Sequence, residues 1–370
     1  MVYSKYAYLN GGFAMKKLNV AVIGQGRSGR DIHGVYFKSE KNTQFNVAYV
    51  VDRDEKRRER ALGEYPSCEV FASYTELFDK KDIDLVLNST ISNEHFEVTK
   101  DLLEHGFNVL VEKPFARTRY ECDTLIKLAK DKGVKLAVFQ QTFFAPYYEG
   151  LIDVMKSGKL GEIKQVDITF SNLARRWDWQ TAQVTLGGNI YNTGPHPIGI
   201  ALGVLDFDEN AQVAFSKLDH VLSSGDSDDY SKIILTAPGR PVVDLEINST
   251  DAYPVNHVKL IGTRGTYRSD VNSYKMKYIV DGENPERELV LSSYENEEGY
   301  PAYCSEELIT HEESGEYVGS AFDVGTQRFY EMMYDAIVND VEMTVKPEHA
   351  SMIIGVIEEV HAANPLPVKF

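Results

Sequence analysis

The apolar positions in the first 140 residues change their spacing repeatedly along the chain. Short runs rich in valine, leucine and isoleucine alternate with longer stretches in which apolar residues recur every three or four positions. The runs indicate buried strands and the longer stretches amphipathic helices. Strands are predicted at residues 18–23, 45–51, 69–72, 83–88, 107–113 and 134–139, and helices at 54–63, 74–78, 93–105 and 117–132. This alternation predicts an α/β domain with a doubly wound parallel sheet, a Rossmann domain.

After Pro146 the pattern becomes a series of period-2 runs without intervening helices. Such a series predicts an antiparallel sheet. A helix to about Ser157 precedes it, and two helical patterns at 324–339 and 348–363 end the chain, with Pro347 opening the second. The runs lie at residues 161–172, 211–218, 230–237, 242–248, 257–262 and 274–280. We place the boundary near Phe139, between a dinucleotide-binding domain at 15–138 and an α+β domain at 139–370 whose last helices are free to pack back on the first.

Length and composition agree with two folded domains. The chain has 370 residues, 43% of them hydrophobic and 26% charged, which is enough for two cores. Its formal charge of −17, from 56 acidic and 39 basic residues, repels phosphate backbones and anionic membranes. We therefore expect neither a nucleic acid nor a membrane as partner.

The cysteines and the chain start bear on the compartment. Cys68, Cys122 and Cys304 lie far apart without a C-x-x-C spacing, so we expect reduced thiols in a cytoplasmic protein and no metal site. No apolar run approaches the roughly 18 to 20 residues that cross a bilayer. Residues 1–14 make a poor signal peptide, and we interpret them as an upstream extension, either a tag or an alternative start, before Met15.

Glycines follow the first predicted strand. The sequence LNVAVIGQGRSGRDIHG places Gly24, Gly26 and Gly29 in a G-x-G-x-x-G pattern between a strand and a helix. In a dinucleotide-binding turn the first glycine permits the tight turn, the second the approach of the pyrophosphate, and the third close packing of helix on strand. The phosphates would lie at the helix amino terminus.

An acid follows the second strand at the expected distance. Asp52 lies twenty-three residues after Gly29, where an acid typically accepts hydrogen bonds from the ribose hydroxyls. Asp52 would repel the 2′-phosphate of NADP, which favours NAD. Arg53 could accept that phosphate, so NADP stays an alternative. Because ligands of such sheets gather at the carboxyl ends of the strands, Thr90 and Lys113 should share this edge.

Five further motifs carry a family resemblance. They are Glu112-Lys113-Pro114, the stretch GGNIYNTGPH at 187–196, TISNEH at 90–95, QTFFAP at 141–146 and IGTRGTY at 261–267. With the glycine pattern, they make the chain from Met15 onward resemble the glucose-fructose oxidoreductase and inositol dehydrogenase family. The resemblance implies NAD or NADP, a sugar, cyclitol or related polyol as substrate, and a second domain with a large, open, mostly antiparallel sheet. One face of that sheet would border the active site and the other would serve oligomer contacts, in a homo-dimer or homo-tetramer. The expected cofactor-binding residues are Gly24, Gln25, Gly26, Arg27, Ser28, Gly29, Asp52, Arg53, Thr90, His95, Glu112 and Lys113.

The resemblance also implies the catalytic residues Lys113 and His196. Lys113 would hydrogen-bond the reacting oxygen, and His196 would be the general base. A proline follows Lys113, and a cis bond there would fix the direction of the lysine. Two positions depart from the family, since Asn192 replaces an aspartate and Thr142 an arginine.

Local pattern refines the role of His196. Ile198, Ala201, Leu202 and Leu205 share one helical face, and Pro195 and Pro197 are tolerated only in a first turn. We therefore expect a helix through this segment, capped by Asn192 or Thr193, whose positive end and the nicotinamide together keep His196 neutral. Asn192 either orients His196 or a substrate hydroxyl, or is a plain cap.

The stretch ARRWDWQT at 174–181 supplies the substrate contacts. Trp177 and Trp179 suit the apolar faces of a sugar, and Arg175, Arg176 or Asp178 its hydroxyls. The alternative is a core tryptophan pair beside a solvated arginine. The expected substrate-binding residues are Lys113, Gln141, Arg176, Trp177, Trp179, Asn192 and His196.

Three functions fit these features. The first is an NAD(P)-dependent dehydrogenase that acts on a CH–OH group of a sugar, glycoside or cyclitol. The second is a non-catalytic dinucleotide-binding sensor similar to a co-repressor. The third is an enzyme with tightly held NAD that oxidises its substrate transiently, in glycoside hydrolysis or sugar-to-sugar exchange.

Overall fold

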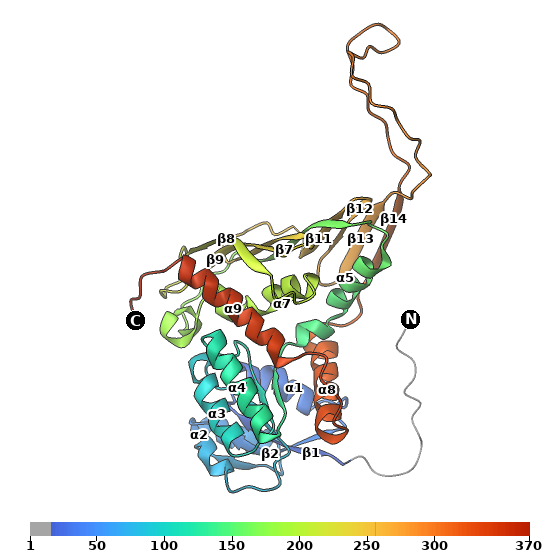
Figure 1. Cartoon of the computed structure of the whole chain (residues 1–370). Helices are drawn as coiled ribbons and strands as arrows, with labels where there is room; N and C mark the ends of the chain where they lie inside the picture. The colour runs from blue at the N-terminus through green and yellow to red at the C-terminus, as the bar shows by residue number, and fades with distance from the viewer. Residues whose placement is uncertain (1–15, 256) are drawn as a thin grey trace, which may run out of the picture.

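The computed structural model describes residues 16–255 and 257–370. The expected extension at residues 1–14 lies outside the described residues. Within them the chain forms two sheets with helices between and around them (Figure 1). The smaller sheet belongs to the first part of the chain and the larger one to the second.

The first sheet has six parallel strands in the order β3-β2-β1-β4-β5-β6. This confirms the predicted doubly wound sheet, whose order reverses between β1 and β4, the switch point beside which ligands of such folds bind. The strands are β1 (Leu18–Ile23), β2 (Phe45–Val51), β3 (Glu69–Phe71), β4 (Leu85–Asn88), β5 (Val109–Val111) and β6 (Leu136–Val138).

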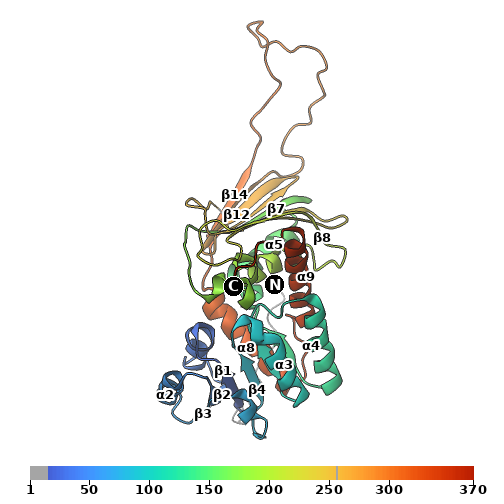
Figure 2. The ribbon, with the colours of Figure 1, turned by 90° about the vertical axis from the view of Figure 1, so that its left-hand side faces the viewer.

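Alternate side chains of these strands enter two different cores. Val20 and Val22 of β1 pack with α1, α2 and the C-terminal α8, whereas Ala21 and Ile23 pack with α3 and α4. Helices therefore cover both faces of the sheet, as Figure 2 also shows. The helices are α1 (Gly34–Phe37), preceded by a π-helical segment at Arg27–His33, α2 (Glu55–Glu64), α3 (His95–Glu104) and α4 (Arg119–Lys132), with 3-10 turns at Tyr74–Leu77 and Ser92–Glu94.

The second sheet has eight strands in the order β14-β13-β12-β11-β7-β10-β9-β8. Every neighbouring pair is antiparallel except β7 and β10, which run parallel. The mostly antiparallel sheet was predicted, but β12 and β14 were not, because the first was interpreted as part of a turn and the second lacks an apolar alternation. The strands are β7 (Ile163–Ser171), β8 (Gln212–Asp219), β9 (Tyr230–Thr236), β10 (Val242–Asn248), β11 (Val258–Gly262), β12 (Gly265–Ser269), β13 (Ser273–Tyr278) and β14 (His311–Glu316).

One face of the second sheet packs on helices. Val166 and Ile168 of β7 and Leu245 of β10 are fully buried there, beside α7 and α9. α8 joins the core of the first sheet, and α9 also packs along α4. These helices are α5 (Pro146–Ser157), α6 (Asn189–Asn192), α7 (Pro195–Val204), α8 (Thr326–Val338) and α9 (Pro347–Ala363), with 3-10 turns at Gln141–Phe144, Trp179–Thr181 and Gln183–Thr185 and a π-helical turn at Ala321–Gly325.

Candidate active site

The glycine turn after β1 contains two kinds of glycine. Gly24 has φ +93°, and a Cβ there would lie 2.4 Å from the Ser89 carbonyl oxygen; a Cβ on Gly29 would lie 1.9 Å from the Gly24 oxygen. Gly26 has φ −75°, and its Cβ would meet nothing nearer than Arg57 Nη1 at 3.9 Å. The protein's own packing thus demands Gly24 and Gly29 but not Gly26. The open space at Gly26 fits a ligand that approaches the backbone, as a pyrophosphate does.

Asp52 lies beside this turn with its carboxylate tied to backbone. Its Oδ2 accepts from the Gln25 N–H at 2.7 Å and its Oδ1 from the Asp54 N–H at 2.9 Å. Arg53 forms a two-point ion pair with Glu94, at 2.9 and 3.2 Å. The guanidinium that could have taken a 2′-phosphate is thus already paired.

Sequence reasoning missed the arginines of α2. Arg57 Nη1 lies 3.5 Å from Asp52 Oδ2, Arg58 donates to the Asp52 and Arg53 carbonyl oxygens, and Arg60 donates to the Gln25 carbonyl at 2.8 Å. The signal was the basic run KRRER at residues 56–60, shortly after Asp52. These arginines brace the turn from outside.

Glu112, at the carboxyl end of β5, is buried in a relay that joins distant parts of the chain. Its Oε1 lies 3.0 Å from His33 Nε2, and His33 Nδ1 lies 2.8 Å from the hydroxyl of Tyr330 on α8. Its Oε2 accepts from the Lys113 N–H at 3.0 Å. Burial alone would raise the pKa of Glu112, but the hydrogen bond and charge of His33 outweigh it and hold this pKa well below its usual range. Glu112 is therefore ionised and fixes the backbone that presents Lys113.

Lys113 points from β5 toward the second domain. Its Nζ donates to the Asn192 carbonyl oxygen at 2.7 Å and lies 3.5 Å from Asn192 Oδ1. Burial lowers its pKa; the charge of Glu112 opposes this, and those of Arg27 and Arg176 add to it. The bond from Lys113 to Pro114 is cis, as the sequence suggested.

Thr90 and His95 lie next to the carboxyl end of β5, and His95 connects to the backbone there. His95 Nδ1 lies 2.6 Å from the Pro114 carbonyl oxygen and its Nε2 3.2 Å from that of Thr90. Burial lowers the pKa of His95, and the hydrogen bonds with the Pro114 and Thr90 carbonyls oppose this. The histidine links the loop after β4 to the loop after β5.

His196 lies in the first turn of α7, near enough to Lys113 for the charge of the lysine to act on it. Its Nδ1 is 2.8 Å from Thr142 Oγ1. Burial lowers its pKa to about 3, with a further contribution from the charge of Lys113. The expected neutral imidazole is present, but burial and Lys113 cause it. An imidazole that acts as a base through Nε2 keeps its proton on Nδ1, and Thr142 Oγ1 is placed to accept that hydrogen bond.

The predicted cap of this helix was wrong. Its N-cap is Gly194, in a helical conformation and without a side-chain cap bond. Asn192 is the last residue of the preceding short helix α6. Thr193 has a helical backbone conformation, so it lacks the extended conformation that a capping residue requires. Asn192 instead presents both its oxygens to Lys113.

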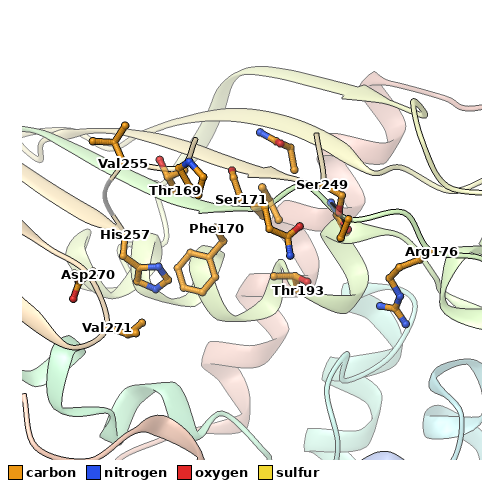
Figure 3. A pocket seen from close by; sticks show the side chains of 16 residues that line it. Thr169, Phe170, Ser171, Arg176, Thr193, Ser249, Val255, His257, Asp270 and Val271 are labelled. Atoms are coloured by element: carbon orange, nitrogen blue, oxygen red, sulfur yellow. Dashed lines mark hydrogen bonds between the residues drawn. The ribbon is translucent and has the colours of Figure 1, made fainter. Parts of the chain in front are cut away.

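A cavity of about 460 Å³ is lined by residues of β7 and β10, of the segment before β11 and of the turn after β12 (Figure 3). Arg176 and Thr193 lie at one side of it and Phe170 and His257, whose rings are 3.8 Å apart, at the other. Burial lowers the pKa of His257 to about 4. The lining is neutral amides, hydroxyls and apolar groups together with Arg176 and Asp270, namely Thr169, Phe170, Ser171, Asn172, Ala174, Arg176, Asn189, Thr193, Ile247, Asn248, Ser249, Pro254, Val255, His257, Asp270 and Val271.

A smaller cavity beside this space is lined by Asn192, the residue to which Lys113 donates; Lys113 and His196 line neither cavity. It shares Arg176 and Asn189 with the large cavity and is also lined by Asn192 and Asp228. Asp228 is 1% exposed; its Oδ2 accepts from the Ile190 N–H at 2.9 Å, and its Oδ1 has no hydrogen-bond partner among the described residues. Burial raises the pKa of Asp228 to about 7. Sequence reasoning missed it, although the run DSDD marks the place.

The expected substrate residues are only partly brought together. Arg176 lines both cavities, paired with Asp178, and Asn192 lines the smaller one. Trp177 and Trp179 are 77% and 44% exposed and line neither, so the alternative of a core tryptophan pair is wrong. Gln141 is buried away from both cavities.

The described residues contain no group of three or more histidine, cysteine or acidic side chains arranged to hold a metal ion. Nor, in residues 16–255 and 257–370, is any helix both long and apolar enough to pass through a bilayer.

The fold and site together define an oxidoreductase with a nicotinamide dinucleotide, and comparison with known proteins agrees. Residues 18–140 match the oxidoreductase family with an NAD-binding Rossmann fold, and residues 148–268 match the GFO/IDH/MocA C-terminal domain. The chain belongs to the Gfo/Idh/MocA family, which confirms the resemblance. Its first domain is an NAD-binding domain.

Relatives cover the chain to different extents. The uncharacterized oxidoreductase YdgJ of Escherichia coli is 25% identical over 92% of this chain and 94% of its own length. The uncharacterized oxidoreductase YhhX of Escherichia coli is 35% identical, over 41% of this chain and 44% of its own. The scyllo-inositol 2-dehydrogenase (NADP(+)) IolW of Bacillus subtilis is 25% identical, over 51% and 52%. The chain thus spans about half the length of several curated relatives that it matches.

Solved structures share the fold. GenD2 from gentamicin A biosynthesis, in complex with NAD, has a TM-score of 0.75 at 19% identity, over 95% of each chain. KijD10, a 3-ketoreductase from Actinomadura kijaniata in complex with NADP, has a TM-score of 0.72 at 17% identity, over 94% of this chain and 98% of its own.

Proposed function

We propose that the protein moves a hydride between NAD and a secondary alcohol carbon of a sugar, glycoside or cyclitol. The observation that carries the proposal is that Lys113, at the carboxyl end of β5, donates to Asn192, which lines the smaller cavity, and that the charge of Lys113 acts on the buried His196. The relatives add sugar chemistry, since one is a scyllo-inositol dehydrogenase and another a dTDP-3,4-didehydro-2,6-dideoxy-alpha-D-glucose 3-reductase.

The dinucleotide, when bound, supplies the hydride acceptor. Lys113 Nζ donates a hydrogen bond to the reacting oxygen and stabilises negative charge that grows on it. Its bond to the Asn192 carbonyl fixes the direction of Nζ, and the buried Glu112 fixes its backbone. His196 accepts the hydroxyl proton at Nε2 while Thr142 holds Nδ1. Its lowered pKa keeps the base free at neutral pH.

The cofactor residues favour NAD over NADP. Asp52, which we expect at the ribose, has a buried carboxylate, and Arg53 is paired with Glu94. The lining of the large cavity favours a neutral polyhydroxylated substrate, because Asp178 and Gln180 already satisfy its Arg176. A cytoplasmic location, the division near Phe139 and the expected site contacts of Gln141, Trp177 and Trp179 stay predictions.

A second candidate follows from one relative. A protein of Mediterraneibacter gnavus that is 23% identical over 77% of this chain is a 2,7-anhydro-N-acetylneuraminate hydratase, a reaction without net oxidation. The second candidate is therefore an enzyme that oxidises its substrate transiently with tightly held NAD. Dinucleotide that copurifies with the protein, and product formed without change at 340 nm, would favour it.

The experiment is a substrate panel with variants. Purified protein is incubated with NAD or NADP and with inositols, monosaccharides and glycosides while absorbance at 340 nm is followed. With an active substrate, His196→Asn should lower kcat/KM by roughly 10²- to 10⁴-fold, as loss of a general base does. Lys81→Glu, an exposed change in the first domain, is the control. No turnover with any substrate, together with tight binding of NAD, would favour the sensor.

A further inference from the structure

Asp228 and its neighbour Asp229 are both buried, but only Asp229 has both carboxylate oxygens occupied. Asp229 accepts from three backbone N–H groups, those of residues 221–223, at 2.6, 2.7 and 2.6 Å. Asp228 accepts from the Ile190 N–H through Oδ2, and its Oδ1 has no hydrogen-bond partner among the described residues. Because a buried carboxylate oxygen without a partner is costly, we expect a ligand to donate to it.

The free oxygen of Asp228 lies against Gly188, and both residues line the smaller cavity. Gly188 has φ +103°, and a Cβ there would lie 2.2 Å from Asp228 Oδ1, so a glycine is needed at this position. The cavity has a volume of about 10 Å³, which is room for one water molecule or one hydroxyl group. Arg176 and Ser249, both labelled in Figure 3, line this cavity and the large one. The two cavities therefore lie side by side.

The other polar groups that line the smaller cavity indicate which group fits there. Arg176 is already paired with Asp178, so it does not neutralise the free oxygen. Asn192 has its Oδ1 3.5 Å from Lys113 Nζ, and its amide nitrogen donates to no described residue. Ser223 Oγ also lacks a described partner, but a hydroxyl rotates to donate or to accept. The carboxylate oxygen needs a donor and the amide nitrogen an acceptor, and a hydroxyl group can be both at once.

We propose that Asp228 determines substrate specificity: its Oδ1 accepts a hydrogen bond from one hydroxyl group of the substrate, and that hydroxyl fills the smaller cavity. This inference rests on the proposed function, because it takes the substrate to be a polyol in the large cavity. It narrows the substrate class to polyols with a free hydroxyl at the position that reaches Asp228. A methoxy, acetamido or phosphate group at that position is too large for a space of about 10 Å³.

Asp228→Asn reverses the polarity of this contact with almost no change in size. Its side-chain oxygen has to accept from the Ile190 N–H, so its NH₂ group faces the cavity. The variant therefore presents a donor where the wild type presents an acceptor. Because it removes a buried charge and keeps the bond to Ile190, it should fold.

Binding is measured by calorimetric titration at pH 8, where the Asp228 carboxyl is ionised, on protein saturated with NADH, with which an alcohol cannot react. The probes are myo-inositol, scyllo-inositol, D-glucose and D-galactose, and then the monodeoxy and monodeoxyfluoro analogues of the tightest binder. At one ring position the wild type should lose about tenfold or more in affinity with both analogues, because neither hydrogen nor fluorine donates to a carboxylate. In Asp228→Asn the fluoro analogue should bind more tightly than the deoxy analogue, since an NH₂ group can donate to fluorine.

Asp226→Asn is the matched control, because it makes the same change two residues away and Asp226 lines neither cavity. It should keep the wild-type preference among the analogues. The role of Asp228 is overturned by analogues that bind alike at every ring position, by a preference that Asp228→Asn leaves unchanged, or by a lack of binding of all four polyols. Oxidation with NAD but equal binding of all analogues would overturn this role and leave the proposed function in place. The expected preference without any oxidation would support the role of Asp228 and overturn the dehydrogenase.

Discussion

The glycine turn on the cofactor side and the cavities on the substrate side differ in how their polar groups are satisfied. On the cofactor side, Asp52 holds the Gln25 N–H and Ser89 Oγ donates to the Ile23 and Gly24 carbonyls, at 2.8 and 3.0 Å. On the substrate side, buried side-chain atoms of Ser171, Ser223, His257 and Asp228 have no partner among the described residues; in the glycine turn the side-chain amide of the buried Gln25 also lacks one, so there it is the backbone bonds that are complete.

This difference separates a fixed ligand from a variable one. Backbone bonds and glycines shape the turn for one dinucleotide, and packing within the protein demands Gly24 and Gly29. Buried hydroxyls, an imidazole and a carboxyl without protein partners leave hydrogen-bonding capacity that a polyhydroxylated ligand can use. Substitutions on the cofactor side should therefore mainly lower stability. Substitutions on the substrate side should mainly lower activity.

The strongest test of this view compares two glycines of one turn. Gly29→Ala places a methyl group against the Gly24 oxygen, so it should lower the free energy of unfolding by roughly 3 kcal/mol or more. Gly26→Ala has room and should leave stability within about 0.5 kcal/mol, yet weaken NAD binding at least about tenfold. Urea unfolding without NAD and titration with NAD measure the two effects. Equal losses of stability would contradict the distinction.

The next effect concerns Asp228 on the substrate side. Its raised pKa means that the folded chain binds this proton more tightly than the unfolded chain. The resulting stability is present below about pH 4 and is lost as the pH rises through about 7. Asp228→Asn should remove this dependence and be more stable than the wild type at pH 8, by on the order of 3 kcal/mol.

Asp226→Asn is the matched control from the same loop. Burial would raise the pKa of Asp226, but hydrogen bonds from the Lys369 and Gln183 backbones lower it. Asp226→Asn should therefore lose stability at pH 8. Urea unfolding of both variants at pH 4.5 and pH 8 decides, and a wild-type stability that rises steadily toward pH 8 relative to Asp228→Asn would refute the assignment.

These contrasts also explain what the sequence could and could not predict. The strand ends that carry Gly24, Asp52 and Lys113 follow from the pattern of apolar residues, because each strand is stabilised by burial along its whole length. The bond between His33 and Tyr330 joins residues 297 positions apart, and no local pattern encodes it. Asp228 was missed because an acidic run is usually solvated, and nothing in the run itself shows that this carboxyl is buried.

The helix of His196 shows an intermediate case. Periodicity and two prolines predicted α7 correctly. The pKa of His196 is lowered as expected, but by burial and the charge of Lys113 and not by the helix end from which it was predicted. The cap was wrong because a second short helix precedes it, and four residues are too few for periodicity to reveal. The exposed tryptophans differ again, since the orientation of a loop side chain depends on neighbours that the local sequence does not contain.

A smaller effect concerns the charge at Asn192. Asn192→Asp places a carboxylate beside Lys113 Nζ, and its negative charge should raise the pKa of Lys113 and that of His196, on which the charge of Lys113 acts. The acidic limb of kcat/KM, below about pH 4 in the wild type, should move toward pH 5. Asn192→Ala, which removes the amide without adding charge, should leave the limb in place. An unchanged limb in Asn192→Asp would show that His196 does not set it.

The smallest effect tests whether an ion pair between side chains helps the cofactor side to exclude NADP. Glu94→Gln releases Arg53 from its two-point ion pair without disturbing a backbone bond of the turn. Exposed pairs are worth about 0.5–1 kcal/mol, so KM for NADP should fall about two- to fivefold while KM for NAD stays the same. The double variant Glu94→Gln with Arg53→Ala should lose this gain. If it keeps the gain, the freed guanidinium is not what binds the 2′-phosphate, and discrimination lies with Asp52 alone.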